Sequence, residues 1–176
     1  PKTPSMVGEG VLLFENKNSL TDNEKSEIID LFSCLGLVEE IPSELMGIGG
    51  AISGCGPAFM DMIMESYADA AVKYGIPRTL AYKLIAQTML GSAKLELQSG
   101  SHPGALKDAV CSPGGTTIRG VAALEKAGLR GACIDCICCY FVYFVVYFVY
   151  FSNNLQGINR MNYYFVYFVY FVYFVY

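Results

Sequence analysis

The chain has 176 residues, a formal net charge of -4 and an apolar content of 53%. This length allows one domain, or one domain and a fragment of another. The acidic balance and the lack of any basic run argue against a nucleic-acid-binding protein, because phosphate binding needs clustered Lys and Arg.

The seven cysteines are odd in number and lack the regular spacing of a disulfide framework. We interpret them as the reduced thiols of a cytoplasmic protein. Cys133 and Cys136 have the spacing of half a zinc site, but no second pair follows and the only histidine is His102. The sequence therefore predicts no metal site.

The first third of the chain alternates between strand and helix. Val11 to Glu15 is predicted as a strand, and Thr21 with Glu24 forms a capping-box pattern for a helix that ends before Gly36. Val38 to Ile41 could be a second strand. Three such elements are typical of the end of a doubly wound sheet but cannot make one alone. Because the chain opens on Pro1 without Met, we expect that it lacks the start of a longer protein.

From Pro57 the pattern becomes almost purely helical. One helix is predicted from Pro57 to Gly75, and a second from Pro77 to Ser99. Shorter helices follow around residues 105–110 and 117–126, and a last helical stretch runs into Cys136. So much apolar and small-residue surface on long helices indicates burial against another subunit.

The end of the chain has a different character. Tyr140 to Phe151 and Tyr163 to Tyr176 are near-repeats of Tyr-Phe-Val around a polar stretch, and 18 of the 24 Phe and Tyr residues follow Cys139. Each run is shorter than the roughly 20 residues of a membrane span. We interpret residues 140–176 as a low-complexity artefact, such as a repeat expansion or a frame error. The alternative is a genuine membrane-associating or fibre-forming tail, and we expect no membrane contact without it.

The segment richest in chemistry is Leu-Lys-Asp-Ala-Val-Cys-Ser-Pro-Gly-Gly-Thr-Thr-Ile, residues 106–118. Two glycines after Pro113 free the backbone and leave room for a ligand, and a helix then begins at Thr116 or Thr117. The first amides of a helix have no acceptor within it, so they bind a carboxylate or phosphate without Lys or Arg. An ordinary glycine turn with a Thr cap is the alternative.

This segment resembles the signature of the pyrroline-5-carboxylate reductase family, including the following Ala-Leu-Glu helix. Other motifs agree in collinear order over residues 1–137: Pro-Lys-Thr-Pro at the start, Ser-Gly-Cys-Gly-Pro-Ala-Phe at 53–59, Gly-Ile-Pro-Arg at 75–78, Ala-Gln-Thr-Met-Leu-Gly at 86–91 and His-Pro-Gly at 102–104. The resemblance implies a mostly α fold: an all-helical dimerisation and substrate-binding domain at 51–139, preceded at 1–50 by the C-terminal remnant of an α/β Rossmann-like domain.

The resemblance also implies an activity: hydride transfer from NADPH or NADH to the imine of 1-pyrroline-5-carboxylate, giving L-proline. The family's substrate loop falls on Ser112, Gly114, Gly115, Thr116 and Thr117. We expect Ser112 and the amides of Gly115 and Thr116 to hold the carboxylate. Thr117, the catalytic candidate, would contact the ring nitrogen through its hydroxyl. Lys2, Thr3 and Pro4 correspond to the nicotinamide side.

The chain departs from the family pattern in two respects. The Gly-x-Gly-x-x-Gly phosphate turn is absent, and the glycines of Gly47 to Gly50 lie outside any strand-turn-helix unit. Lys2 stands where the family usually has Asn. His102 is interpreted as a structural hydrogen-bonder, and Asp61 and Asp69 as solvated carboxylates.

We expect a homodimer through the helical domain, possibly in a higher oligomer. Two alternatives to the reductase stay open. One is a non-catalytic dimerisation module or pseudoenzyme, and the other is a related imine or hydroxy-acid reductase.

Overall fold

The computed structural model describes residues 3–139, which form two compact units. Among the described residues, the first comprises those up to Cys55 together with residues 136–139, and the second runs from Gly56 to Asp135. The predicted Tyr-Phe-Val tail, residues 140–176, and Lys2 lie outside the described residues.

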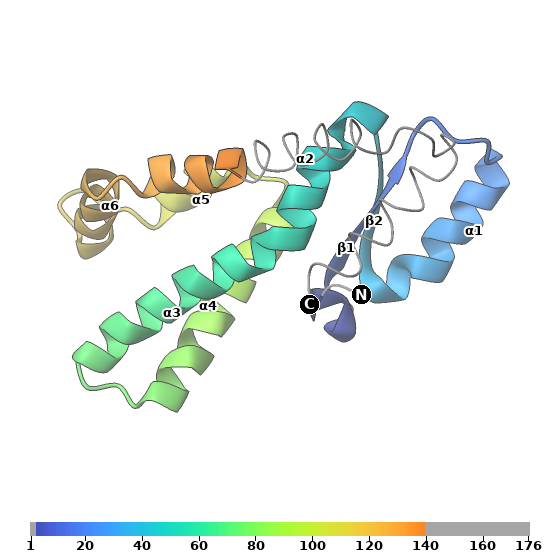
Figure 1. The fold of residues 1–176 in the computed structure, drawn as a ribbon. Helices are drawn as coiled ribbons and strands as arrows, with labels where there is room; N and C mark the ends of the chain where they lie inside the picture. The colour runs from blue at the N-terminus through green and yellow to red at the C-terminus, as the bar shows by residue number, and fades with distance from the viewer. Residues whose placement is uncertain (1–2, 140–176) are drawn as a thin grey trace, which may run out of the picture. The chain divides into compact units, whose positions relative to one another are not determined.

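The first unit is built on one strand-helix-strand element. Strands β1 (Gly10–Glu15) and β2 (Gly36–Ile41) pair in parallel, with Gly10 opposite Gly36. Helix α1 (Asp22–Phe32) and the 3-10 turn η2 (Ser33–Leu35) connect them. Figure 1 shows β1 and β2 side by side, with α1 next to β2. These two strands and the helix are those predicted from the sequence.

Helix α1 begins with the predicted capping box. The Glu24 carboxylate accepts the Thr21 amide at 2.7 Å, and the Thr21 hydroxyl accepts the Glu24 amide at 3.3 Å. Lys25 on the same helix forms an ion pair of 2.8 Å with Glu40 on β2. The helix is thus fixed both at its start and against the sheet.

The two strands differ in chemical character. Four of the six residues of β1 carry large apolar side chains (Gly-Val-Leu-Leu-Phe-Glu), as expected of a strand covered on both faces. In contrast, β2 carries Glu39 and Glu40 in its middle, which is typical of an edge strand. The 3-10 turn η1 (Thr3–Val7) precedes β1 and packs against it.

The chain becomes helical earlier than the sequence predicts. After the 3-10 turn η3 (Ser43–Leu45), helix α2 (Met46–Gly50), the π-helical turn η4 (Ala51–Cys55) and helix α3 (Gly56–Lys73) follow without a break. Pro57 therefore does not occupy the first helical position, and that prediction is wrong. The wider π turn accommodates the missing amide and the ring of Pro57.

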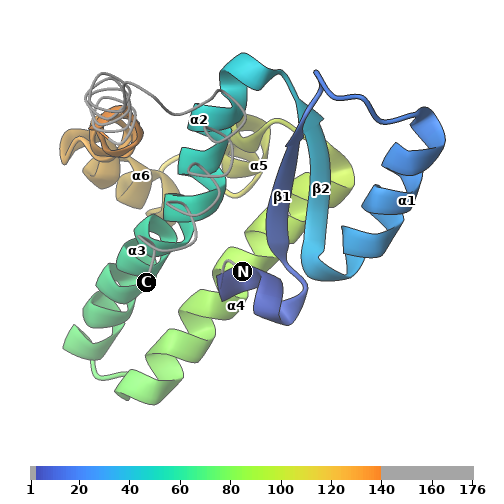
Figure 2. The same ribbon diagram turned by 45° about the vertical axis from the view of Figure 1, so that its right-hand side comes forward.

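The second unit contains a helical hairpin. Helices α3 and α4 (Arg78–Ser99) run antiparallel and lie against each other, as Figure 2 shows. Ala68 on α3 and Ala81 on α4 are fully buried, and their small size lets the helices approach closely. Asp69 and Arg78 form an ion pair across the connecting loop. Helix α4 ends at Gly100, which has a φ of 62°, as predicted.

Two shorter helices complete the described part of this unit. These are α5 (Pro103–Ala109) and α6 (Thr116–Lys126), and residues 129–135 of this unit are also helical. The predicted fold class, a mostly helical chain with an α/β remnant at its start, is confirmed. No helix within residues 3–139 is both long enough and apolar enough to cross a bilayer.

Within residues 3–139, the fully buried apolar side chains are all alanines: Ala51, Ala68 and Ala81. Large apolar side chains stay open to solvent, with Met62 69% exposed and Leu97 77% exposed. A single copy therefore buries little of the apolar surface on its helices, which carries a cost in water.

Candidate functional site

The loop between α5 and α6 forms a tight turn. The Gly115 amide donates to the Ser112 carbonyl oxygen at 3.0 Å, with Pro113 and Gly114 in the two central positions. Gly114 has a φ of 70°, the left-handed geometry that the third residue of a type II turn requires. The ring of Pro113 fixes its own φ angle, which is that of the second residue of the turn. The sequence Ser-Pro-Gly-Gly thus determines the turn locally.

The side chain of Ser112 folds back over the turn. A Cβ atom added to Gly115 would overlap the Ser112 hydroxyl and lie 3.1 Å from the Ser112 carbonyl oxygen. Glycine at position 115 thus leaves room for the Ser112 hydroxyl, which a side chain there would push aside. Its backbone is extended, with φ -70° and ψ 175°, as is usual for the residue before a helix.

The start of α6 is open. Gly115 is the N-cap and has no side-chain capping bond, and no acidic residue lies in the first turn. The first amides of a helix have no intrahelical acceptor, so those of Thr116 and Thr117 point outward with partial positive charge. Both threonines are exposed. The Gly115 amide, expected from the sequence to be one of the donors, is already used by the turn.

Helix α5 leads into this loop, and His102 is its N-cap. The His102 ring nitrogen Nδ1 accepts a hydrogen bond of 3.0 Å from the Gly104 amide, and Pro103 occupies the first helical position. The structural hydrogen bond expected of His102 is confirmed. At the other end of α5, the Asp108 carboxylate raises the pKa of Lys107, mainly through a direct hydrogen bond.

The residues predicted on the nicotinamide side are only partly described. Thr3 and Pro4 begin the turn η1, whereas Lys2 lies outside the described residues. The connection from β1 to α1 contains no glycine, and Gly47 to Gly50 are helical in α2. The described residues therefore do not fit the phosphates of a dinucleotide, which need a glycine-rich strand-to-helix turn.

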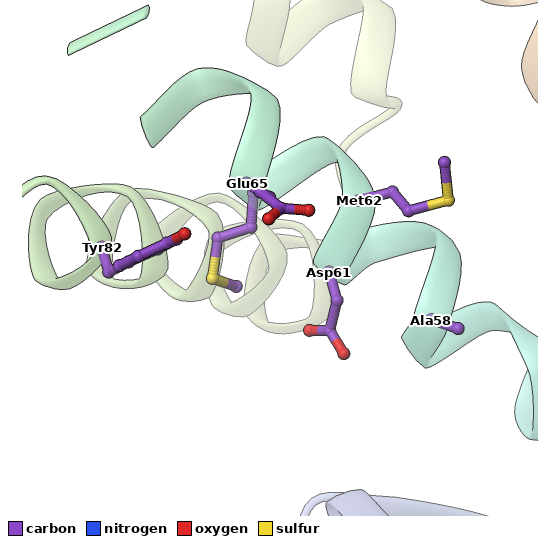
Figure 3. A pocket seen from close by; sticks show the side chains of 6 residues that line it. Ala58, Asp61, Met62, Glu65 and Tyr82 are labelled. Atoms are coloured by element: carbon purple, nitrogen blue, oxygen red, sulfur yellow. The ribbon is translucent and has the colours of Figure 1, made fainter. Parts of the chain in front are cut away.

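A shallow hollow lies on the helical hairpin, away from the loop residues. It has a volume of about 380 Å³ and is lined by Ala58, Asp61, Met62, Met64 and Glu65 of α3 and by Tyr82 of α4. Figure 3 shows its two carboxylates on neighbouring turns of α3. Their negative charge is unsuited to a carboxylate or phosphate ligand. Its lining is mainly apolar side-chain surface.

The other titratable candidates have simpler roles in the structure. Asp69 pairs with Arg78, and Asp61 is an exposed residue at the hollow. No three His, Cys, Asp or Glu side chains gather as metal ligands within residues 3–139.

Fold and loop together define the class: a helical dimerisation domain of an oxidoreductase family. The family model for pyrroline-5-carboxylate reductase dimerisation matches residues 43–140, more than half of the chain. The chain belongs to this family, and the resemblance found in the sequence is confirmed.

Individual relatives agree. The chain is 44% identical to pyrroline-5-carboxylate reductase of Escherichia coli K12 over 135 residues, which are 77% of this chain and 50% of that protein. Its fold is similar to pyrroline carboxylate reductase of Plasmodium falciparum, crystallised with NADP bound, with a TM-score of 0.73, 35% identity and coverage of 81% and 58% of the two chains. The corresponding enzyme of Coxiella burnetii gives a TM-score of 0.76 at 31% identity, with coverage of 81% and 53%. The chain spans about half the length of the curated relatives it matches.

Proposed function

We propose that this chain is the substrate-binding and dimerisation part of a pyrroline-5-carboxylate reductase, which reduces 1-pyrroline-5-carboxylate to L-proline. The observation that carries the proposal is the open start of α6 behind the Ser112–Gly115 turn. It offers unpaired amides and hydroxyls to a small anion, and the substrate is a small ring with one carboxylate.

In this proposal, the Thr116 and Thr117 amides and the Ser112 hydroxyl hold the carboxylate. Gly114 leaves open space on its side of the loop, which supports close contact between ring and backbone, and the Ser112 hydroxyl lies beside Gly115. The Thr117 hydroxyl reaches the ring nitrogen and orients the imine, and it accepts a hydrogen bond from the N–H of the protonated imine, which favours that form. The task of this loop is positioning, since holding a reactant in the right geometry supplies much of the rate in such reactions.

The hydride donor is NADPH or NADH in the family activity that we propose. The described residues lack the glycine-rich turn for its phosphates, so we derive no step through it. The second candidate is a non-catalytic dimerisation module. The absence of a glycine-rich turn from the described residues favours it. Joining the chain to the half of the Escherichia coli relative that it does not match separates the two, because the part of a reductase would then reduce 1-pyrroline-5-carboxylate and a non-catalytic module would not.

We further propose that two copies associate through the second unit. The exposed apolar side chains of α3 and α4 support this, because a second copy would remove them from water. The mainly apolar lining of the hollow also suits a helix of the partner. Assembly beyond a dimer and a cytoplasmic location stay predictions.

The carboxylate proposal is tested by titrating the chain with L-proline and following the amide resonances of Thr116 and Thr117. We expect saturable shifts at these two amides. Pyrrolidine, which has the same ring without the carboxylate, is the matched control and should leave them unchanged. Equal shifts with both ligands, or none at the start of α6, would contradict the proposal.

A further inference from the structure

We infer that His102 is a positioning residue for the Ser112–Thr117 loop, acting through helix α5 as its side-chain cap. The inference rests on the proposed function in one respect, namely that this loop holds substrate. It adds a residue ten positions before the loop, which does not contact the substrate itself.

The first observation is the cap. The Nδ1 atom of His102 accepts the Gly104 amide at 3.0 Å, and the His102 carbonyl oxygen accepts the amides of Ala105 and Leu106 at 2.8 and 3.2 Å. Helix α5 has only seven residues. So short a helix is marginal without fixed ends, so a cap contributes a large part of its stability.

The second observation is the space beneath the ring. A Cβ atom on Gly104 would lie 2.9 Å from Nδ1 and 3.1 Å from Cε1 of His102. The φ of Gly104 is not positive, so no backbone strain demands a glycine there. Glycine here leaves room for the imidazole, which an alanine would push aside. The position of the His102 ring therefore depends on the absence of a side chain at Gly104.

The third observation is the short connection between α5 and α6, which contains two hydrogen-bonded turns. The Cys111 amide donates to the Asp108 carbonyl oxygen at 3.0 Å, and the Gly115 amide donates to that of Ser112 at 3.0 Å. Helix α6 then begins at Thr116. Two hydrogen-bonded turns, closed at Cys111 and at Gly115, thus follow α5 directly in the chain, so we expect loss of the first turn of α5 to loosen the Ser112 turn.

Hydrogen exchange on the 176-residue chain tests this. We expect His102→Ala to speed exchange at Cys111 and Gly115 roughly fivefold, the usual effect of losing one helix cap. His102→Asn should restore slow exchange, because its side-chain oxygen can accept the Gly104 amide. Thr21→Ala removes the cap of α1 and is the matched control, which should leave both amides unchanged.

Gly104→Ala gives a second, independent variant. Alone it should displace the imidazole and speed exchange as His102→Ala does, whereas in the His102→Ala background it should have no further effect. The inference is overturned if His102→Ala speeds exchange only within α5, if His102→Asn fails to restore it, or if the effects of the two substitutions add. An L-proline titration separates the two claims. If the wild-type chain does not bind L-proline, the proposed function fails, while the exchange data still decide the role of His102.

Discussion

Gly10 and Gly36 lie opposite each other at the first position of the two parallel strands, and neither has room for a side chain. A Cβ atom on Gly36 would overlap the carbonyl oxygen of Gly10. A Cβ atom on Gly10 would overlap the Ser5 hydroxyl and lie 2.8 Å from the Leu35 carbonyl oxygen. This close pair fixes the register of the sheet at its start.

We therefore expect Gly36→Ala to destabilise the first unit. Gly36 has a φ of 134°, and strain at such an angle costs about 1–3 kcal/mol before the overlap is counted. Urea unfolding of the chain would measure the loss. Gly131→Ala is the control, since nothing lies within 4 Å of its added Cβ atom and alanine favours a helix. Equal stability of Gly36→Ala and wild type would rule out the close contact described here.

The capping box of α1 predicts a pH dependence. The Thr21 amide, and then its hydroxyl, hold the pKa of Glu24 below its ordinary value of 4.5. A carboxyl with a lowered pKa in the folded state stabilises that state fully above the ordinary value and loses its contribution as the pH falls through the lowered one. Unfolding midpoints at pH 6 and pH 3.5 should thus differ more in wild type than in Glu24→Gln, which keeps an acceptor but does not titrate.

Glu27→Gln, an exposed carboxyl on the same helix, serves as the control for general charge effects. If it reduces the difference between the two pH values as much as Glu24→Gln does, the capping box is not the cause.

The proposed reaction makes Thr117 the sensitive hydroxyl. In a version of the chain completed with the half of the Escherichia coli relative that it does not match, we expect Thr117→Ala to lower turnover about 10- to 100-fold, because one hydrogen bond to the reacting nitrogen is lost. Affinity for NADPH should stay nearly the same. Thr117→Ser keeps the hydroxyl and should stay near wild type. Unchanged turnover in Thr117→Ala would count against the role proposed for it.

The proposed dimer predicts the behaviour of Met62, which is 69% exposed in the single chain. Met62→Lys should weaken self-association at least tenfold, because it would place a charge in the interface. A lysine here lies three residues before Glu65, so it does not disfavour helix α3 itself. Sedimentation equilibrium measures the association, and circular dichroism checks the helix. A variant that associates like wild type would show that the interface lies elsewhere.

Local signals explain which parts of the fold the sequence could predict. The capping box at Thr21, the end of α4 at Gly100 and the turn at Pro113 depend on residues close in the chain, and all three are found. The identity of the candidate loop came from the same kind of local pattern, read together with its resemblance to a family.

The early helix at Met46 could not be predicted in this way. Gly47, Gly49 and Gly50 all disfavour a helix by propensity, and Pro57 indicates a helix start. Packing decides instead: a Cβ atom on Gly49 would lie 2.6 Å from Leu13 and 2.9 Å from Ile41. Those partners are distant in sequence, so the reason for this glycine is visible only in the fold. The close contact between the His102 ring and Gly104 could not be predicted either. A His-Pro-Gly pattern does not indicate the conformation of the imidazole.

The alanines that make up the fully buried apolar set of residues 3–139 have a thermodynamic consequence. A lone chain that shields so little hydrocarbon should take up little heat on unfolding, show a small heat-capacity step and lose its structure over a broad temperature range. Association of two copies would sharpen that transition, and its midpoint would rise with protein concentration. Dilution would then act on this molecule much as a denaturant does.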